Sequence, residues 1–123
     1  MILVDTSVWI DHLRRGDSGL IDLLEGSQVL VHPFIVGELA CGYLTNRTEV
    51  LRLLRALPQA PAATDDEALG FIETHSLMGR GIGYVDVHLL ASVALDAAAT
   101  FWTRDRRLVA VAVQLGLAYR EST

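Results

Sequence analysis

The sequence predicts an α/β fold with a mainly parallel sheet that is covered by helices. Short apolar runs, such as residues 2–4 and 100–102, alternate with longer segments of helical periodicity. Repeated strand–helix units with short apolar strands are typical of a parallel sheet. The chain of 123 residues, 51% of them hydrophobic, suits one compact domain over residues 1–123 with a core that needs no disulfide or structural metal.

Five strands are expected along the chain. The first is the apolar run that opens the sequence, and the fourth is the run Thr-Phe-Trp late in the chain. Pro61 lacks a backbone N–H, which favours an edge position for the third. The expected strands are residues 2–4, 28–32, 59–63, 100–102 and 117–119.

Helices fill the segments between these strands. Thr6 or Ser7 is expected to cap the first helix and Gly16 to end it, while Pro33 suits the first turn of the third. The glycine-rich loop 79–83 comes directly before the most apolar helix. The expected helices are residues 6–16, 19–26, 33–45, 48–57, 65–79, 84–99 and 106–116.

Composition restricts the classes of protein that the chain can represent. Cys41 is the only cysteine, which excludes an internal disulfide and a cysteine zinc cluster. The apolar start is too short for a signal peptide, and no run approaches membrane-spanning length, so we expect a soluble cytoplasmic protein with no membrane partner.

The charge pattern leaves two interpretations open. A formal net charge of −5 argues at first against nucleic acid. All ten basic residues are arginine, however, and arginine suits bidentate contact with phosphate. A simple compositional bias explains the absence of lysine equally well.

Two acids lie just beyond predicted strands. Asp5 directly follows strand 2–4, and Asp105 comes shortly after strand 100–102. In a parallel sheet both positions fall at the carboxyl edge, where binding sites form. Each acid also precedes a helix, so a simple N-capping role is the alternative.

Two further acids lie on apolar helices. Glu38 shares a predicted helical face with Phe34 and Cys41, where a glutamate needs a partner or a metal, and an inward salt bridge is the alternative. Asp86 lies in the first turn of the segment 84–99 and is expected to point toward packed structure, although an acid there is also ordinary helix chemistry.

Taken together, the four acids predict a metal site at one edge of the sheet. Carboxylates that gather there raise one another's pKa values and need cations to stay ionised. Oxygen ligands without cysteine or paired histidines favour Mg²⁺ or Mn²⁺ over zinc. Such a site suits metal-assisted attack of water on a phosphodiester.

The segments "ILVDTSVWID", "GEL", "GYVDVHLLASVAL" and "FWTRDRRL" resemble those of PIN-domain nucleases, and in particular VapC toxins of bacterial toxin–antitoxin pairs. The resemblance runs from Met1 to about Leu115. It implies a PIN-like three-layer sandwich with a five-stranded sheet and Mg²⁺- or Mn²⁺-dependent endoribonuclease activity on structured RNA of the tRNA or rRNA class. It also implies a homodimer and a VapB-like antitoxin that inserts a segment near the site.

The resemblance assigns roles to individual residues. Asp5, Glu38, Asp86 and Asp105 correspond to the catalytic acids, with Asp5, Asp86 and Asp105 as metal ligands. Ser7 and Thr103 match the supporting hydroxyls of the family. At Arg107 and Leu108 the chain departs from the family's frequent acid and aromatic residue, which affects the substrate groove.

Candidate RNA contacts are the arginines that flank the expected site, and a solvated face with ion pairs is the alternative for them. These arginines are Arg14, Arg15, Arg104, Arg106 and Arg107. Exposed apolar side chains between Phe34 and Leu54 could serve a dimer or antitoxin interface, or simply the core.

Other functions fit the sequence less well. An inactive PIN-like interaction module is a competing reading, but it would be expected to lack one of the four acids. A phosphatase with Asp5 as nucleophile usually carries a second aspartate at the position of Ser7. A receiver domain needs a lysine, which the chain lacks.

Overall fold

A computed structural model, which describes residues 1–121, shows a three-stranded parallel sheet. The strands are β1 (Ile2–Val4), β2 (Val29–Leu30) and β3 (Thr100–Trp102), in the order β2-β1-β3. β1 is therefore central, and its side chains are buried. The predicted α/β class with a parallel sheet is confirmed.

The prediction of five strands is wrong for the described residues. In place of the two outer strands, single parallel bridges join Gln59 to Val31 and Ala118 to Phe101. Pro61 has no N–H to extend the first pairing. The second pairing, from Phe101 N–H to Leu117 O and from Tyr119 N–H to Phe101 O, has only a short strand beside it. The outer segments therefore pair with the sheet without becoming strands.

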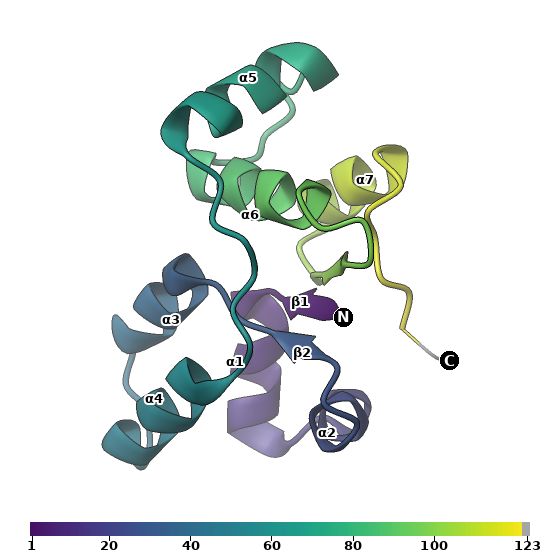
Figure 1. Cartoon of the computed structure of the whole chain (residues 1–123). Helices are drawn as coiled ribbons and strands as arrows, with labels where there is room; N and C mark the ends of the chain where they lie inside the picture. Colours follow the sequence, from purple (N-terminus) through teal and green to yellow (C-terminus); the bar gives the residue numbers. More distant parts are fainter. Residues whose placement is uncertain (122–123) are drawn as a thin grey trace.

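The helices form two groups with the strands between them (Figure 1). One group contains α1 to α4 and the other α5 to α7, and the extended segment 57–64 runs from the first to the second. The helices are α1 (Thr6–Arg15), α2 (Ser18–Glu25), α3 (Pro33–Ala40), α4 (Arg47–Ala56), α5 (Asp65–His75), α6 (Tyr84–Ala94) and α7 (Arg106–Gln114).

Each helix ends earlier than predicted, by one or two residues in four of them and by four or five in α3, α5 and α6. After α3, the guanidinium of Arg47 donates to the carbonyls of Ala40 and Gly42 and closes the turn into α4. Ser76, with φ of 53°, ends α5 in the left-handed conformation that often terminates helices. After α6, the Asp96 carboxylate accepts from the backbone of Ala98 and fixes a turn. Local hydrogen bonds thus override the apolar periodicity.

Helix starts agree better with local sequence signals. Thr64 and Glu67 form a reciprocal capping box at α5. Pro33 occupies the first turn of α3, as expected. The prediction that Thr6 or Ser7 caps α1 is wrong, because Asp5 lies at the cap position.

The core surrounds β1 and reaches into both helix groups. Leu3 and Val4 are fully buried, as are Val8 of α1, Leu90 of α6 and Leu108 of α7. Apolar side chains cover both faces of β1. The first polar residue after the strand is Asp5, which lies at the carboxyl edge of the sheet. No helix within residues 1–121 is long and apolar enough to cross a membrane.

The buried side chain of His32 makes the stability of this core depend on pH. The side chain is 2% exposed, and its Nδ1 accepts from the backbone of Phe34 at 3.0 Å, capping α3. Burial, and the nearby His88, lower the pKa of His32 below its ordinary 6.5. The folded protein therefore holds this imidazole neutral.

We expect acid to reduce stability through His32. As the pH falls below about 6.5, the unfolded chain binds a proton that the folded one does not, so the free energy of unfolding falls until the lowered pKa is reached. His32→Asn retains a capping side chain but removes the titration. Urea unfolding at pH 7.5 and 5.5 should show a smaller loss in this variant. An equal loss in both proteins would contradict the prediction.

Candidate active site

Asp5 lies immediately beyond the central strand and is only 7% exposed. Its backbone N–H donates to Trp102 O at 2.8 Å, which prolongs the pairing of β1 with β3. The side chain makes no capping bond to α1, so the capping interpretation is wrong for this carboxylate. Instead, Oδ2 accepts hydrogen bonds from the hydroxyls of Thr103 at 2.7 Å and Ser7 at 2.9 Å.

Ser7 and Thr103 also connect the loop after β3 to α1. Thr103 Oγ1 accepts from the backbone of Asp105 at 3.2 Å, and Ser7 Oγ accepts from the backbone of Arg104 at 3.0 Å. Each hydroxyl thus donates to Asp5 and accepts from the loop. These two residues hold the ends of β1 and β3 in one arrangement.

Asp105 begins α7. Its Oδ1 accepts from the backbone of Leu108 at 3.0 Å, so the capping role considered for it is confirmed. The residue is nevertheless exposed. Capping fixes the side chain through one oxygen and leaves the other for a different role.

Asp86 lies in the first turn of α6, where its Oδ2 accepts from the backbone of Gly83 at 3.1 Å. Desolvation, as the largest cause, raises the pKa of Asp86, and the charges of Asp5, Asp105 and Glu38 raise it further. The fold therefore brings all four predicted acids within electrostatic reach of one another.

Glu38 is held differently from the expectation. It is exposed and forms no salt bridge within residues 1–121, so the inward salt bridge considered as the alternative is wrong. Its Oε1 accepts from the hydroxyl of Thr6 at 2.8 Å, which joins α3 to α1. Thr6 was predicted only as a possible cap of α1, and no local feature of the sequence indicates its bond to Glu38, because the two residues lie on different helices.

The four acids share one pattern of hydrogen bonding. Each carboxylate uses one oxygen to accept from a protein donor, and within residues 1–121 its second oxygen accepts no hydrogen bond from the protein. The second oxygens are Asp5 Oδ1, Glu38 Oε2, Asp86 Oδ1 and Asp105 Oδ2. None of the four forms a salt bridge with any residue in this range.

These donors fit a hard divalent cation in chemistry. Carboxylate oxygens are the ligands that Mg²⁺ and Mn²⁺ prefer. In the conformation described, however, no three His, Cys, Asp or Glu side chains of residues 1–121 are arranged so that they could hold a metal ion. Repulsion between unneutralised carboxylates favours such separation, so binding of an ion requires the side chains to approach.

Arg104 is committed to ion pairs. Its guanidinium contacts Asp11 at 2.7 Å, Asp17 at 2.6 Å and Glu121 at 2.6 Å, and lies 5.3 Å from the ring centre of Trp102. The bond to Glu121 is the largest of the causes that raise the pKa of this arginine. In turn, Arg104 lowers the pKa of Asp17. The side chain thus braces the loop between Thr103 and Asp105, and the ion-pair alternative describes it better than RNA contact.

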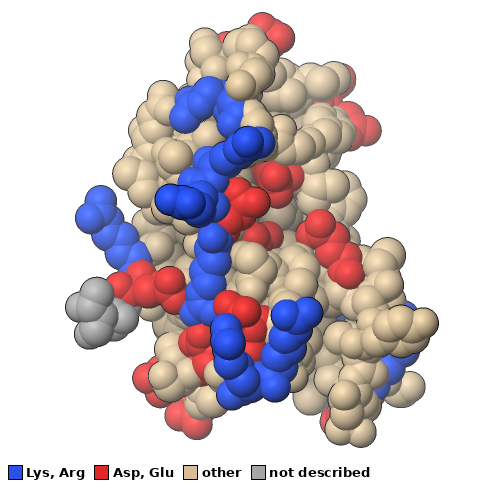
Figure 2. Space-filling view, turned by 180° about the vertical axis from the view of Figure 1, so that it is seen from behind, with Lys and Arg blue, Asp and Glu red and all other residues tan. Residues whose placement is uncertain are grey.

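The other arginines remain available at the surface. Arg14, Arg106 and Arg107 are exposed, and Arg15 makes only a 3.5 Å contact with Asp11. Figure 2 shows a band of arginine side chains running down one face beside several carboxylates. Cationic and anionic groups are therefore adjacent on this face, although the net charge is −5.

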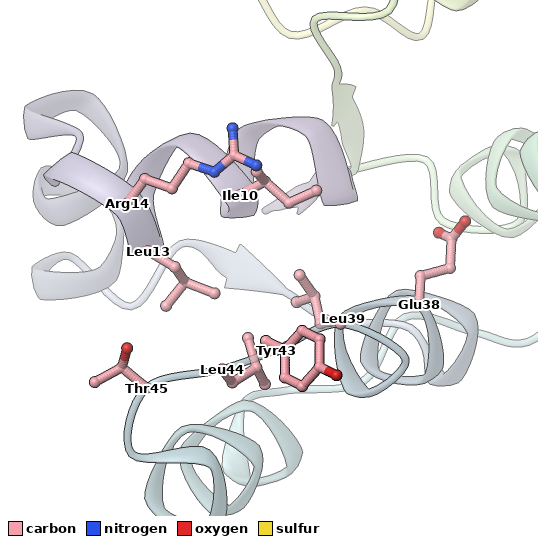
Figure 3. A pocket seen from close by; sticks show the side chains of 9 residues that line it. Ile10, Leu13, Arg14, Glu38, Leu39, Tyr43, Leu44 and Thr45 are labelled. Carbon is pink, nitrogen blue, oxygen red and sulfur yellow. The ribbon is translucent and has the colours of Figure 1, made fainter.

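A cavity of about 390 Å³ lies beside Glu38, between α1 and the turn after α3. Leu13, Leu39 and Leu44 line it together with Arg14. In Figure 3, the Glu38 carboxylate and Thr45 lie at opposite ends of this cavity. The cavity thus leads from an apolar surface to one of the four acids.

The fold and this acidic edge place the chain in a known class. The PIN domain family matches residues 2–114, nearly the whole chain, and the protein belongs to that family. It is similar to the protein named Ribonuclease VapC32 from Mycobacterium tuberculosis, in each of two strains. The identity is 49% over 121 residues, which cover 98% of both chains.

The hydroxyl of Thr103 should contribute measurably to stability. Thr103→Val removes the donor to Asp5 and leaves a buried carboxylate short of a hydrogen bond, so the free energy of unfolding should fall by about 1.5–3 kcal/mol. Thr103→Ser loses one methyl group and should lose roughly 1 kcal/mol. Urea unfolding compares the two variants. A valine variant as stable as the serine variant would show that this bond contributes little.

Proposed function

We propose that the protein is a Mg²⁺- or Mn²⁺-dependent endoribonuclease toxin of the VapC type, which hydrolyses RNA phosphodiester bonds and is neutralised by a VapB-like antitoxin. The observation that carries this proposal is the set of four carboxylates, each with one anchored and one unanchored oxygen. The relatives named as ribonucleases support it. We also propose that residues 1–123 form a single PIN domain.

Asp5, Asp86 and Asp105 would hold the cation, with Glu38 beside them. A bound divalent ion neutralises the clustered charge, lowers the pKa of water and stabilises negative charge on the phosphoryl oxygens. The raised pKa of Asp86 is consistent with this assignment, because a nearby cation would stabilise the charged form of this partly desolvated carboxylate.

The chain itself supplies orientation and proton transfer. Thr103 and Ser7 fix the Asp5 carboxylate, so little conformational freedom is lost when its free oxygen engages. Glu38 is exposed and anchored by Thr6, which suits it to orient the attacking water and accept its proton. The water oxygen then bonds to phosphorus as the bond to the leaving nucleotide oxygen breaks.

RNA of the tRNA or rRNA class is the proposed substrate, and four arginines are its proposed phosphate contacts. Arg104 is left out because three carboxylates already neutralise it. The proposed contacts are Arg14, Arg15, Arg106 and Arg107.

The alternatives are less consistent with the geometry. An inactive interaction module has no need of four acids without salt bridges in residues 1–121. A phosphatase with Asp5 as nucleophile usually has a second acid where Ser7 lies, and here the Ser7 hydroxyl donates to Asp5 itself.

The cavity beside Glu38 is the proposed position for the inserted antitoxin segment. Its leucines suit an apolar peptide, and its end at Glu38 would let that peptide cover the site. We also propose a homodimer. Light scattering on the protein with and without the product of an adjacent antitoxin gene measures both properties, and a monomer that binds no such product would contradict them.

Asp5→Asn should reduce Mg²⁺-dependent cleavage of total RNA by on the order of a hundredfold or more, because it removes a proposed ligand charge. EDTA should stop cleavage by the unaltered protein. Glu73→Gln, at an exposed position on α5, is the matched control and should cleave normally. Circular dichroism checks the fold of each variant. Full cleavage by a folded Asp5→Asn protein would refute the assignment.

Arg106→Ala should weaken RNA binding. The loss of one phosphate contact is expected to lower the slope of log affinity against log salt concentration by about one unit. Both proteins would carry Asp5→Asn so that the RNA stays intact during fluorescence anisotropy. Arg55→Ala, on the exposed surface of α4, is the control. Equal slopes for Arg106→Ala and this control would leave Arg106 as ordinary surface.

A further inference from the structure

Four aromatic rings form a continuous row beside the acidic edge, which we call the aromatic ladder: His32, Phe34, His88 and Tyr84. Ring centres lie 4.9 Å apart for His32 and Phe34, 5.1 Å for Phe34 and His88, and 4.6 Å for Tyr84 and His88. The last two pairs meet edge to face, at 73° and 85°. The ladder joins the start of α3 to the start of α6.

The buried and exposed members of the ladder are different kinds of residue. The two histidines are 2% and 3% exposed, whereas Phe34 is 38% and Tyr84 is 44% exposed. His88 lies between the exposed rings and contacts both. The buried imidazole of His88 thus packs against two partly exposed rings, Phe34 and Tyr84.

Asp65 fixes one end of the ladder. Its Oδ1 accepts from Tyr84 Oη at 2.7 Å and lies 3.0 Å from His88 Nε2. The hydrogen bond from Tyr84, and then that from His88, lower the pKa of Asp65, so the carboxylate is charged at neutral pH. A ring held by its own hydroxyl loses little freedom on contact with a ligand.

Each exposed ring is close along its helix to a proposed catalytic acid. Phe34 precedes Glu38 by one helical turn, which places them on the same side of α3. Tyr84 precedes Asp86 by two residues in the first turn of α6. The ladder therefore meets the acids through Phe34 and Glu38 on α3, whereas Tyr84 and Asp86 share the first turn of α6 without sharing one side of it.

A cation lies on the loop that leads into Tyr84. The side chain of Arg107 crosses Gly81 so closely that a Cβ there would be 2.8 Å from Arg107 Cδ and 2.9 Å from its Nη1. Gly81 also has φ of 80°, which favours glycine. The side chain of Arg107, a proposed phosphate contact on α7, thus lies against the loop that leads into Tyr84.

We propose that Phe34 and Tyr84 stack against an unpaired nucleobase next to the phosphate that is cleaved. This inference rests on the proposed ribonuclease function and adds a requirement for a flexible, unstacked nucleotide at the cleavage position. Single-stranded RNA is commonly recognised by stacking of its bases on aromatic side chains. In this proposal the two rings contact the base, and the acids lie at the reacting phosphate. Arg107 contacts a neighbouring phosphate.

An apolar peptide fits the ladder less well. The carboxylate of Asp65 and the hydroxyl of Tyr84 make this surface polar at its edge. The cavity that several leucines line lies instead between α1 and the turn after α3, and neither Phe34 nor Tyr84 lines it. The two surfaces therefore suit different ligands.

The test compares ring loss with base loss. The cleavage position of the unaltered protein is first mapped by sequencing the ends of cut total RNA, and synthetic RNAs spanning it are made with and without an abasic nucleotide on either side. Phe34→Leu and Tyr84→Leu should lower kcat/KM for the intact RNA roughly tenfold, as expected for one lost stacking contact. Phe34→Tyr and Tyr84→Phe retain the rings and should lose less activity than the corresponding leucine variants.

The abasic RNA separates stacking from a structural effect. If the rings contact the base, the leucine variants and the unaltered protein should cleave the abasic RNA at similar, reduced rates, because the same contact is already absent. Equal slowing of intact and abasic RNA by the leucine variants would overturn the inference. So would normal cleavage of intact RNA, including the case in which the variants lose only antitoxin binding.

A second measurement uses the unaltered ladder. In an Asp5→Asn protein, RNA with 2-aminopurine next to the cleavage position should lose fluorescence on binding, as the base stacks on a ring. Unchanged fluorescence of the bound RNA would refute the inference even if the leucine variants fail to fold. Absence of any RNA cleavage by the unaltered protein would instead refute the proposed function, and the inference with it.

Discussion

The arrangement of the site depends on the buried carboxylate of Asp5 and the two hydroxyls that donate to it. A charge that is 7% exposed is expensive to bury, and Thr103 and Ser7 offset that cost through one oxygen. Because these hydroxyls also accept from the loop after β3, the same bonds position Arg104 and Asp105. The central strand, the first helix and the last loop are thus coupled at one carboxylate.

In each of the other three acids, too, one carboxylate oxygen accepts a hydrogen bond from the protein and the other accepts none from residues 1–121. A backbone N–H holds Asp86 and another holds Asp105, while a threonine hydroxyl holds Glu38. Helix starts supply two of these anchors, so ordinary capping chemistry also orients the carboxylates of Asp86 and Asp105. Burial in the first place, and then the charges of the other three acids, raise the pKa of Asp86. The hydrogen bonds that anchor the acids stabilise this edge of the sheet, and repulsion between their charges destabilises it.

Much of the fold followed from the sequence, because apolar runs and helix starts are local signals. The three parallel strands and the starts of the seven helices lie close to where they were expected. Three of the four acids follow a strand or begin a helix, and Glu38, near the end of α3, is the exception. The sequence could not show whether the two outer segments form strands, because that depends on pairing with a neighbouring strand that is itself short. The exposure of Glu38 depends on how α3 packs against α1, and the commitment of Arg104 depends on acids far away in sequence. Periodicity within one segment carries no information about either.

In the ion-pair network of Arg104, one arginine contacts three acids, so the effect of a substitution depends on which member is replaced. One guanidinium joins α1 through Asp11, the turn before α2 through Asp17, and the last described segment through Glu121. Loss of any single carboxylate leaves the arginine with two partners, whereas loss of the arginine leaves three acids repelling one another. The guanidinium therefore has no substitute within the network. Among the acids, Asp17 also caps α2 by accepting from the backbone of Leu20, so its loss costs more than one ion pair. Substitution at Asp11 or Glu121 removes one partner of the arginine, whereas substitution at Arg104 removes the contact that joins all three segments.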